Sequence, residues 1–226
     1  QYMYEGDAPL AERRAAALSL DRELLRDLLG AEELRELLDP AVLAALEAEL
    51  QRTAPGWRAG TVEGVEDLLR WLGPLTADAI AERFDPKDVA GGLTAESAVE
   101  TLVAERRAIR VVVAGRPALA APDDAARLRD ALGVALPPGL PAAFTDPVAE
   151  PLVDLVSRFA RTHGPFLTGA VAGTLGVDEA RARAALEELE RQGRVVRGEF
   201  RPDGVEREWC HAEVLRVLRR RSLAAL

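Results

Sequence analysis

Two stretches of this 226-residue chain share one order of expected elements, and this internal repeat constrains the fold more than any other feature. In each stretch an amphipathic helix ends at a Gly-Pro pair, first at Gly73-Pro74 and again at Gly164-Pro165, 91 residues further on. A short helix, a longer helix and two β-rich segments around a turn follow each pair. We therefore expect two copies of one supersecondary unit.

The first copy is expected to contain helices over 77–84 and 95–106, strands over 108–113 and 117–121, and a closing helix over 123–132. The second is expected to contain helices over 169–175 and 178–192, strands over 194–200 and 205–210, and a closing helix over 212–223. The order helix, turn, helix, helix, hairpin is typical of a winged-helix domain. Three short helices cannot close a core alone, so the hairpin must cover their open side. Leu102 and either Leu186 or Leu189 are the expected inward residues of the longer helices.

Alternation along the second hairpin places Val195 on one face and Phe200 on the other. A hairpin with one buried face would bury one of them and not both. The expected turn at its tip is Pro202-Asp203-Gly204, where a glycine can take a positive φ without steric cost.

The predicted fold class is mainly α, with an N-terminal helical stretch before tandem winged-helix units. Leucines spaced three and four residues apart predict short helices over 8–53, and Asp39-Pro40 is typical of a helix start. The breaker-rich segment 53–60 and the proline-rich segment 136–150 serve as boundaries. We expect four parts, listed as a helical segment with linker at 1–60, a first unit at 61–135, a linker at 136–150 and a second unit at 151–226.

The net charge of −9 argues against nucleic acid, but the charge is unevenly distributed. Residues 151–226 contain 13 arginines and 11 acidic residues, whereas the first 150 residues contain 16 basic and 27 acidic residues. Any contact with phosphate is therefore expected in the last third of the chain.

In a DNA-binding winged helix, the third helix enters the major groove and the wing contacts the backbone. The longer helix of the first unit has three acidic residues and no basic residue before Arg106, so this unit is expected to be a packing module. The second unit has candidate DNA contacts on its longer helix and hairpin, namely Arg181, Arg183, Arg194, Arg197, Arg201, Arg207 and Trp209. Two alternatives stay open for it, direct DNA contact or a scaffold or oligomer surface. Trp209 either stacks on an unpaired base or anchors the hairpin.

The residue types that usually carry catalysis are scarce. Cys210 and His211 are adjacent, so their side chains diverge, and we expect neither a metal site nor a nucleophile pair. His163 is expected at a helix end, where an imidazolium would interact favourably with the helix dipole. Trp57 and Trp71 have no dense basic surroundings in the sequence and are interpreted as packing residues.

Five segments spread over the whole chain carry a family resemblance: GDAPLAERR at 6–14, RELLD at 35–39, RGEF at 197–200, EWC at 208–210 and RRRSLAAL at 219–226. In combination they resemble the large helicase-related (Lhr) family of bacterial ATP-dependent DNA helicases. The resemblance implies a segment at the start of the C-terminal extension, after the helicase core, in a protein that moves 3′-to-5′ on single-stranded DNA and is linked to DNA repair. In this family the extension is an array of winged helices that ends in a β-barrel.

The phosphate-binding pattern GxxxxGK[ST] does not occur in these residues, so ATP binding and hydrolysis, with ATP and Mg, are expected of the parent protein only. The expected function is that of a non-catalytic accessory segment without cofactor, serving as scaffold and contacting single-stranded DNA. The alternatives are an oligomerisation module and a stand-alone winged-helix transcription regulator. Expected partners are the helicase core and later modules of the same chain, single-stranded DNA and a second copy of the chain. One cysteine, no long apolar run and no signal peptide favour a cytoplasmic location without membrane contact. The start at Gln1 is expected to be the cut end of a longer chain.

Overall fold

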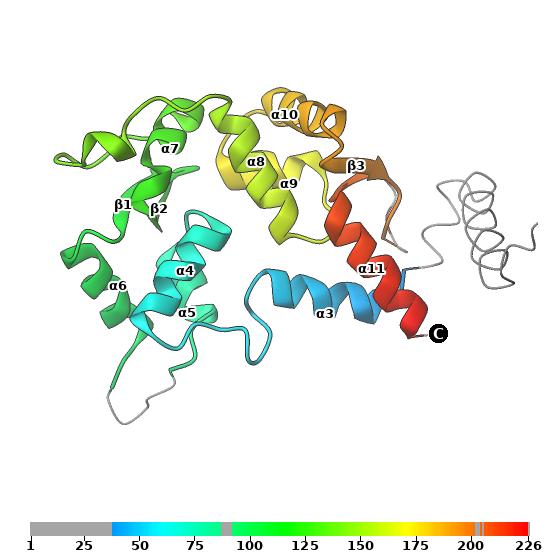
Figure 1. Cartoon of the computed structure of the whole chain (residues 1–226), viewed down its shortest axis with the longest axis horizontal. Coiled ribbons are helices and arrows are strands. Elements are labelled where there is room, and N and C mark those ends of the chain that lie inside the picture. The colour runs from blue at the N-terminus through cyan, green and yellow to red at the C-terminus, as the bar shows by residue number, and fades with distance from the viewer. Residues whose placement is uncertain (1–37, 87–91, 202–203, 205, 226) are drawn as a thin grey trace, which may run out of the picture.

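The computed structural model describes residues 38–86, 92–201, 204 and 206–225, and the fold is mainly helical (Figure 1). The helices expected before residue 38 and most of the turn expected at 202–204 lie outside the described residues. Gly204 is described, and its φ is not positive. The backbone N–H of Gly204 donates to the carbonyl of Arg201 at 3.0 Å, as in a turn at the expected place.

The first stretch contains α4 (Val62–Leu72), α5 (Ala77–Glu82), α6 (Ala95–Ala104), β1 (Ile109–Val113) and β2 (Arg116–Ala120). A threonine caps each of its helices, because the hydroxyls of Thr61, Thr76 and Thr94 accept a backbone N–H three residues further on. The strands turn at Ala114-Gly115, one residue shorter than expected, since Arg116 already pairs with Val113. The closing elements are η1 (Pro122–Asp124) and α7 (Ala125–Leu132).

The second stretch contains α8 (Pro151–Thr162), α9 (Thr168–Leu175), α10 (Glu179–Arg191), β3 (Val195–Gly198), β4 (Glu208–His211) and α11 (Ala212–Ala224). Asp178 caps α10 by accepting the N–H of Arg181, and Gly176 ends α9 in the left-handed conformation. This order is that of the first stretch.

An equivalent β-bridge in each stretch is further evidence that the two stretches are repeats of one unit. The residue after the first Gly-Pro pair, Leu75, pairs with Leu119 of β2 through N–H···O bonds of 2.9 and 2.8 Å. The residue after the second pair, Phe166, pairs with Trp209 of β4 through bonds of 2.9 and 2.8 Å. In both stretches the loop between the first two helices thus extends the hairpin by one short strand.

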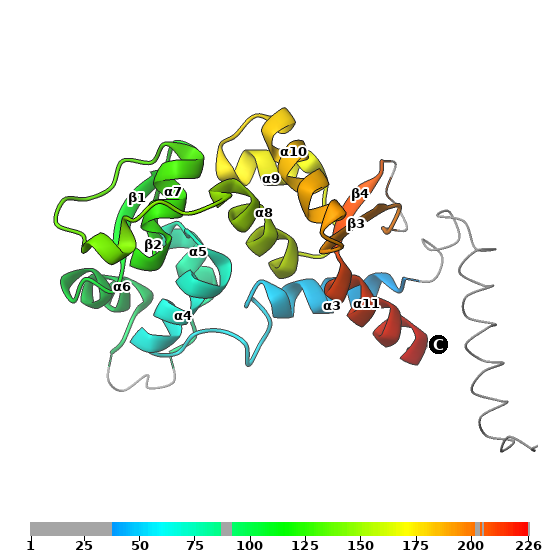
Figure 2. The same ribbon diagram turned by 45° about the horizontal axis from the view of Figure 1, so that its top comes forward.

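The second hairpin is buried on both faces, which corrects the expectation that Val195 or Phe200, but not both, would be buried. Val195 is 1% exposed and packs in the core of the second stretch, whereas Phe200 is 2% exposed and packs with Cys210 on the opposite face. That face is covered by α3 (Pro40–Leu50) and α11, which lie side by side (Figures 1 and 2).

The helix α3 ties the early part of the chain to its end. Asp39 caps α3 through its carboxylate and donates its backbone N–H to the Ser222 hydroxyl at 3.1 Å. Glu49 receives two hydrogen bonds of 2.9 Å from the guanidinium of Arg221 on α11. A segment placed by sequence in the N-terminal part therefore packs on the last helix.

One apolar cluster joins the first hairpin and α7 to the second stretch, whereas α4, α5 and α6 pack in a separate cluster with Leu119 of β2. Ile109, Val111 and Val113 project from β1 into the cluster that also contains α7, α8 and α10. Leu140 and Phe144 of the proline-rich linker pack against this cluster. The tip of the first hairpin touches the second stretch, because a Cβ at Gly176 would lie 2.8 Å from the Cα of Ala114. The first hairpin is therefore a packing element.

Candidate nucleic-acid interface

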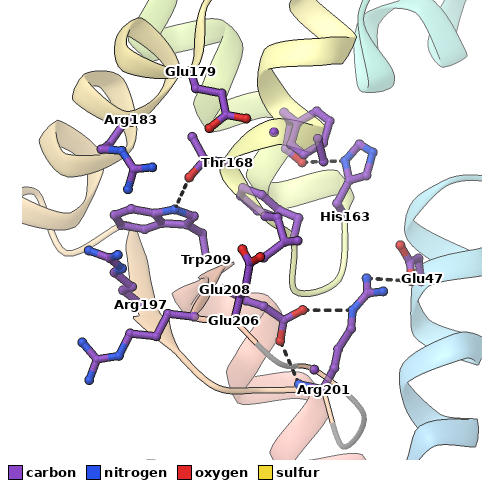
Figure 3. A pocket seen from close by; sticks show the side chains of 17 residues that line it. Glu47, His163, Thr168, Glu179, Arg183, Arg197, Arg201, Glu206, Glu208 and Trp209 are labelled. Carbon is purple, nitrogen blue, oxygen red and sulfur yellow. Dashed lines mark hydrogen bonds and ion pairs between the residues drawn. The ribbon is translucent and has the colours of Figure 1, made fainter.

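A groove of about 1020 Å³ lies between the start of α9, the first turns of α10 and the second hairpin (Figure 3). Five of the seven predicted DNA-contact residues line it, namely Arg183, Arg197, Arg201, Arg207 and Trp209. The hairpin register brings two of them together, since Arg197 pairs with Trp209 across the strands. Acidic side chains share the groove with these residues.

Three of the arginines have available guanidinium groups. Arg197 and Arg207 are exposed and Arg183 is half-buried. None of the three forms an ion pair with a carboxylate among the described residues. Glu179 and Glu206 line the same groove, so the uncompensated positive charge there is small. The groove therefore offers cationic donors but only a weak attraction for phosphate.

Arg201 is occupied by contacts within the protein. Its guanidinium lies 3.2 Å from the carboxylate of Glu208, which is buried, and donates to the carbonyl of Pro165 at 2.6 Å. The other oxygen of Glu208 accepts the backbone N–H of Arg201 at 2.8 Å. This arginine stabilises the end of the hairpin next to its turn and has little charge left for a ligand (Figure 3).

Trp209 is only 1% exposed, and its indole N–H donates to the Thr168 hydroxyl at 3.0 Å. The guanidinium of Arg197 lies over the ring, 5.3 Å from its centroid. Of the two alternatives for Trp209, the structure shows the packing one, because its ring is covered and joins the hairpin to α9.

The remaining two predicted residues point away from the groove. Arg181 donates to the carbonyl of Ala131 at 2.8 Å, at the end of α7. Arg194 donates to the Ser157 hydroxyl on α8 and lines a separate cavity. The predicted set is thus divided among three places, namely the groove, the end of α7 and the separate cavity.

His163 is a half-buried side chain that packs against its own helix. Its ring stacks on Phe159, with the centroids 3.7 Å apart, and hydrogen bonds to the Phe159 carbonyl and the Gln51 amide. Burial lowers the pKa of His163 to about 4. The expected imidazolium at this helix end is therefore wrong, since desolvation outweighs the helix dipole.

The residues considered for catalysis are also structural. Burial raises the pKa of the Cys210 thiol to about 12, which removes it as a nucleophile near neutral pH. His211 begins α11 by accepting the N–H of Glu213 at 3.3 Å, and burial lowers its pKa. Across the part of the chain that the structure describes, no group of three or more His, Cys, Asp or Glu side chains is arranged to hold a metal ion. No described helix is long and apolar enough to cross a membrane.

Sequence reasoning missed a cluster of tryptophans and arginines. The guanidinium of Arg52 lies 4.7 Å from the ring centroid of Trp57 and 4.8 Å from that of Trp71. Arg161 lies over Trp71 at 5.4 Å. These two tryptophans therefore do have basic surroundings, contrary to the expectation. Arg161 is 90 residues away from Trp71 along the chain, so only the tertiary fold reveals the contact.

Residues 36–147 match the family model described as "Large helicase-related protein, winged-helix domain". The chain therefore contains a winged-helix domain.

Over its whole length the chain is 50% identical to "Lhr helicase/ probable uracil glycosylase" of Mycolicibacterium smegmatis and 44% identical to "Lhr helicase/uracil glycosylase" of Escherichia coli. The chain spans 14% of the length of each of these relatives. It belongs to the large helicase-related family, of which it represents one segment.

Proposed function

We propose that this chain is a non-catalytic accessory segment of an ATP-dependent 3′-to-5′ DNA helicase linked to DNA repair. In this proposal it follows the helicase core and forms a scaffold that holds the core relative to later modules of the same chain. The sequence identity to two Lhr helicases supports a place within such a protein. The observation that carries the scaffold role is the apolar cluster in which the first hairpin and α7 pack together with the second stretch.

Both stretches, in this proposal, are winged helices in tandem. The equivalent bridges at Leu75 and Phe166 support this, because each adds the short first strand to the hairpin. Leu102 and Leu186 are both fully buried at the inner face of the third helix. Each hairpin is also covered on its outer face by the closing helix, α7 or α11.

In this proposal the first unit packs against the second unit and does not bind nucleic acid. One face of its hairpin packs against α7 and the second unit, and Ala114 at its tip lies against Gly176, which supports a packing role for this wing. Its third helix, α6, presents exposed Glu96 and Glu100, which would repel phosphate. A rigid joint between two units is what an accessory segment needs in order to fix the modules on either side.

Contact with single-stranded DNA is the second part of the proposal. Arg183, Arg197 and Arg207 line one groove without ion-pair partners among the described residues, which supports phosphate contact there. Only a small positive excess remains after Glu179 and Glu206 are counted, so the contact is expected to be weak and sensitive to salt.

The test uses the full-length helicase that contains this segment. Gly176→Val should separate the first hairpin from α9 and loosen the joint. We expect DNA-dependent ATP hydrolysis to persist and strand separation to fall at least fivefold, because the motor would no longer be held against the later modules. Strand separation at the unmodified rate would contradict the scaffold role.

A further inference from the structure

The cluster around Trp71 lies where α4 and α8 meet, at the joint between the two stretches. One cavity of about 510 Å³ is lined by Arg52, Trp57, Arg58 and Trp71. A second cavity of about 370 Å³ is lined by Arg158, Arg161 and Arg194, and Arg70 lines both. We call this region the junction surface, defined by Arg52, Trp57, Arg58, Trp71, Arg161 and Arg194.

Most of the charged side chains in the second cavity are already paired. Arg158 forms a bidentate pair with Asp124, and Arg127 pairs with Asp154 at 3.1 Å. Arg70 pairs with Glu66 at 2.7 Å. Arg70 also lies 3.7 Å from Asp123, the third acidic residue of this cavity. With these pairs formed, two guanidinium groups in the cavity have no carboxylate partner among the described residues.

The two that remain are Arg161 and Arg194. Neither forms an ion pair with a carboxylate of the described residues, and the polar contact of Arg194 is the Ser157 hydroxyl. Burial lowers the pKa of Arg161, and the neighbouring charges of Arg158 and Arg194 lower it further. An anion that hydrogen bonds to two neighbouring guanidinium groups reduces the electrostatic repulsion between them. This uncompensated charge exceeds that in the groove of the second hairpin, where acidic residues stand beside the arginines.

The first cavity adds an aromatic surface. Trp71 is fixed, because its indole N–H donates to the Leu50 carbonyl at 2.9 Å and two guanidinium groups lie over its ring. Trp57 is 47% exposed, and Arg52 lies over its ring. An exposed indole beside guanidinium groups is the combination that binds unpaired bases along a charged backbone.

We infer that the junction surface binds single-stranded nucleic acid, with a backbone phosphate at Arg161 and Arg194 and a base stacked on Trp57. The inference rests on the proposed contact with single-stranded DNA. It places the main binding site for that DNA where α4 and α8 meet, away from the second hairpin. A duplex would not satisfy the site, because paired bases do not offer a free face to Trp57.

The test measures binding of a fluorescein-labelled oligothymidylate to the 226-residue chain by anisotropy, over a range of salt concentrations. The double variant Arg161→Gln/Arg194→Gln should bind at least tenfold more weakly and show a log K against log salt slope reduced by about 0.7, which is the contribution of the one phosphate contact that is lost. The matched groove variant Arg183→Gln/Arg207→Gln should change affinity less than threefold. Circular dichroism and the melting temperature establish that both variants fold.

A spectroscopic measurement gives a second readout. The oligonucleotide should quench the tryptophan fluorescence of the chain, and Trp57→Phe should remove most of the quenching. The inference would be overturned if quenching persists in Trp57→Phe. It would also be overturned if the junction variant binds like the unmodified chain while the groove variant loses binding. Either result would leave the proposed function in place. If the unmodified chain itself does not bind the oligonucleotide, both the inference and the proposed DNA contact fail.

Discussion

The carboxylate of Asp124 and the guanidinium of Arg158 form a bidentate ion pair that connects the first stretch to α8. Their side chains are 3% and 15% exposed. Asp124 ends the segment that leaves the first hairpin, and Arg158 also lies 3.3 Å from the Cβ position at Gly73. The pair therefore fixes the hairpin exit and the end of α4 against one helix of the second stretch.

Removing one partner of this pair should be strongly destabilising. Asp124→Ala would leave the Arg158 charge buried without its partner, at a cost of about 3–5 kcal/mol in the free energy of unfolding. Urea denaturation measures the change. The control is Glu100→Gln, which breaks the exposed pair with Arg110 and should cost less than about 1 kcal/mol. Equal effects of the two substitutions would contradict a structural role for the Asp124 pair.

Gly176 and Gly133 allow backbone strain to be separated from the contact between the stretches. Both end a helix with a φ near +70°, but only Gly176 has another segment against its Cβ position. Gly133→Ala should cost about 1–2 kcal/mol from the left-handed conformation alone. Gly176→Ala should cost clearly more, because its Cβ would meet the backbone of Ala114. Thermal melting of both variants measures the difference, and equal losses would show that the hairpin tip does not press on α9.

Leu186 tests the orientation of α10. The side chain is fully buried, so Leu186→Ala should lower the free energy of unfolding by about 2–5 kcal/mol. Leu223, which is 61% exposed on α11, provides the control, and Leu223→Ala should leave stability nearly unchanged. A loss below about 1 kcal/mol at Leu186 would mean that α10 presents another face to the core.

His163 should make stability depend on pH. Its pKa is about 4 in the folded chain and 6.5 in the unfolded chain, so the unfolded state binds the proton more tightly. This contribution is fully present above pH 6.5 and is lost as the pH falls towards 4, by about 3 kcal/mol in total. Denaturant titrations at pH 7.5 and 4.5 measure the loss, which should be smaller in His163→Gln. An identical pH dependence in that variant would show that His163 does not remain neutral in the fold.

The repeat and its elements could be predicted from the sequence because they depend on local signals. Helical spacing of Leu and Val, the two Gly-Pro pairs and the turn residues predicted the helices and strands from α4 to α11 within a few residues. These signals act over short distances along the chain, so they need no knowledge of tertiary contacts.

The rest depended on contacts between distant residues. The two-sided burial of the second hairpin requires α3, about 150 residues earlier, to cover Phe200. Arg201 was predicted to contact DNA, but in the structure it forms an ion pair with Glu208. The neutral His163 and the junction surface likewise arise from tertiary neighbours, namely Phe159 for the former and Arg161 for the latter.

The central claim is that the two stretches form one scaffold. Equilibrium urea unfolding of the 226-residue chain tests it most directly, followed both by tryptophan fluorescence and by far-ultraviolet circular dichroism. Trp57 and Trp71 report on the region around α4, Trp209 reports on the second hairpin, and the circular dichroism signal reports on all the helices. Because the first hairpin and α7 pack in one apolar cluster with the second stretch, the account predicts a single transition with the same midpoint for both signals. Two separated transitions, or midpoints that differ between the signals, would show that the stretches unfold independently and would contradict the account.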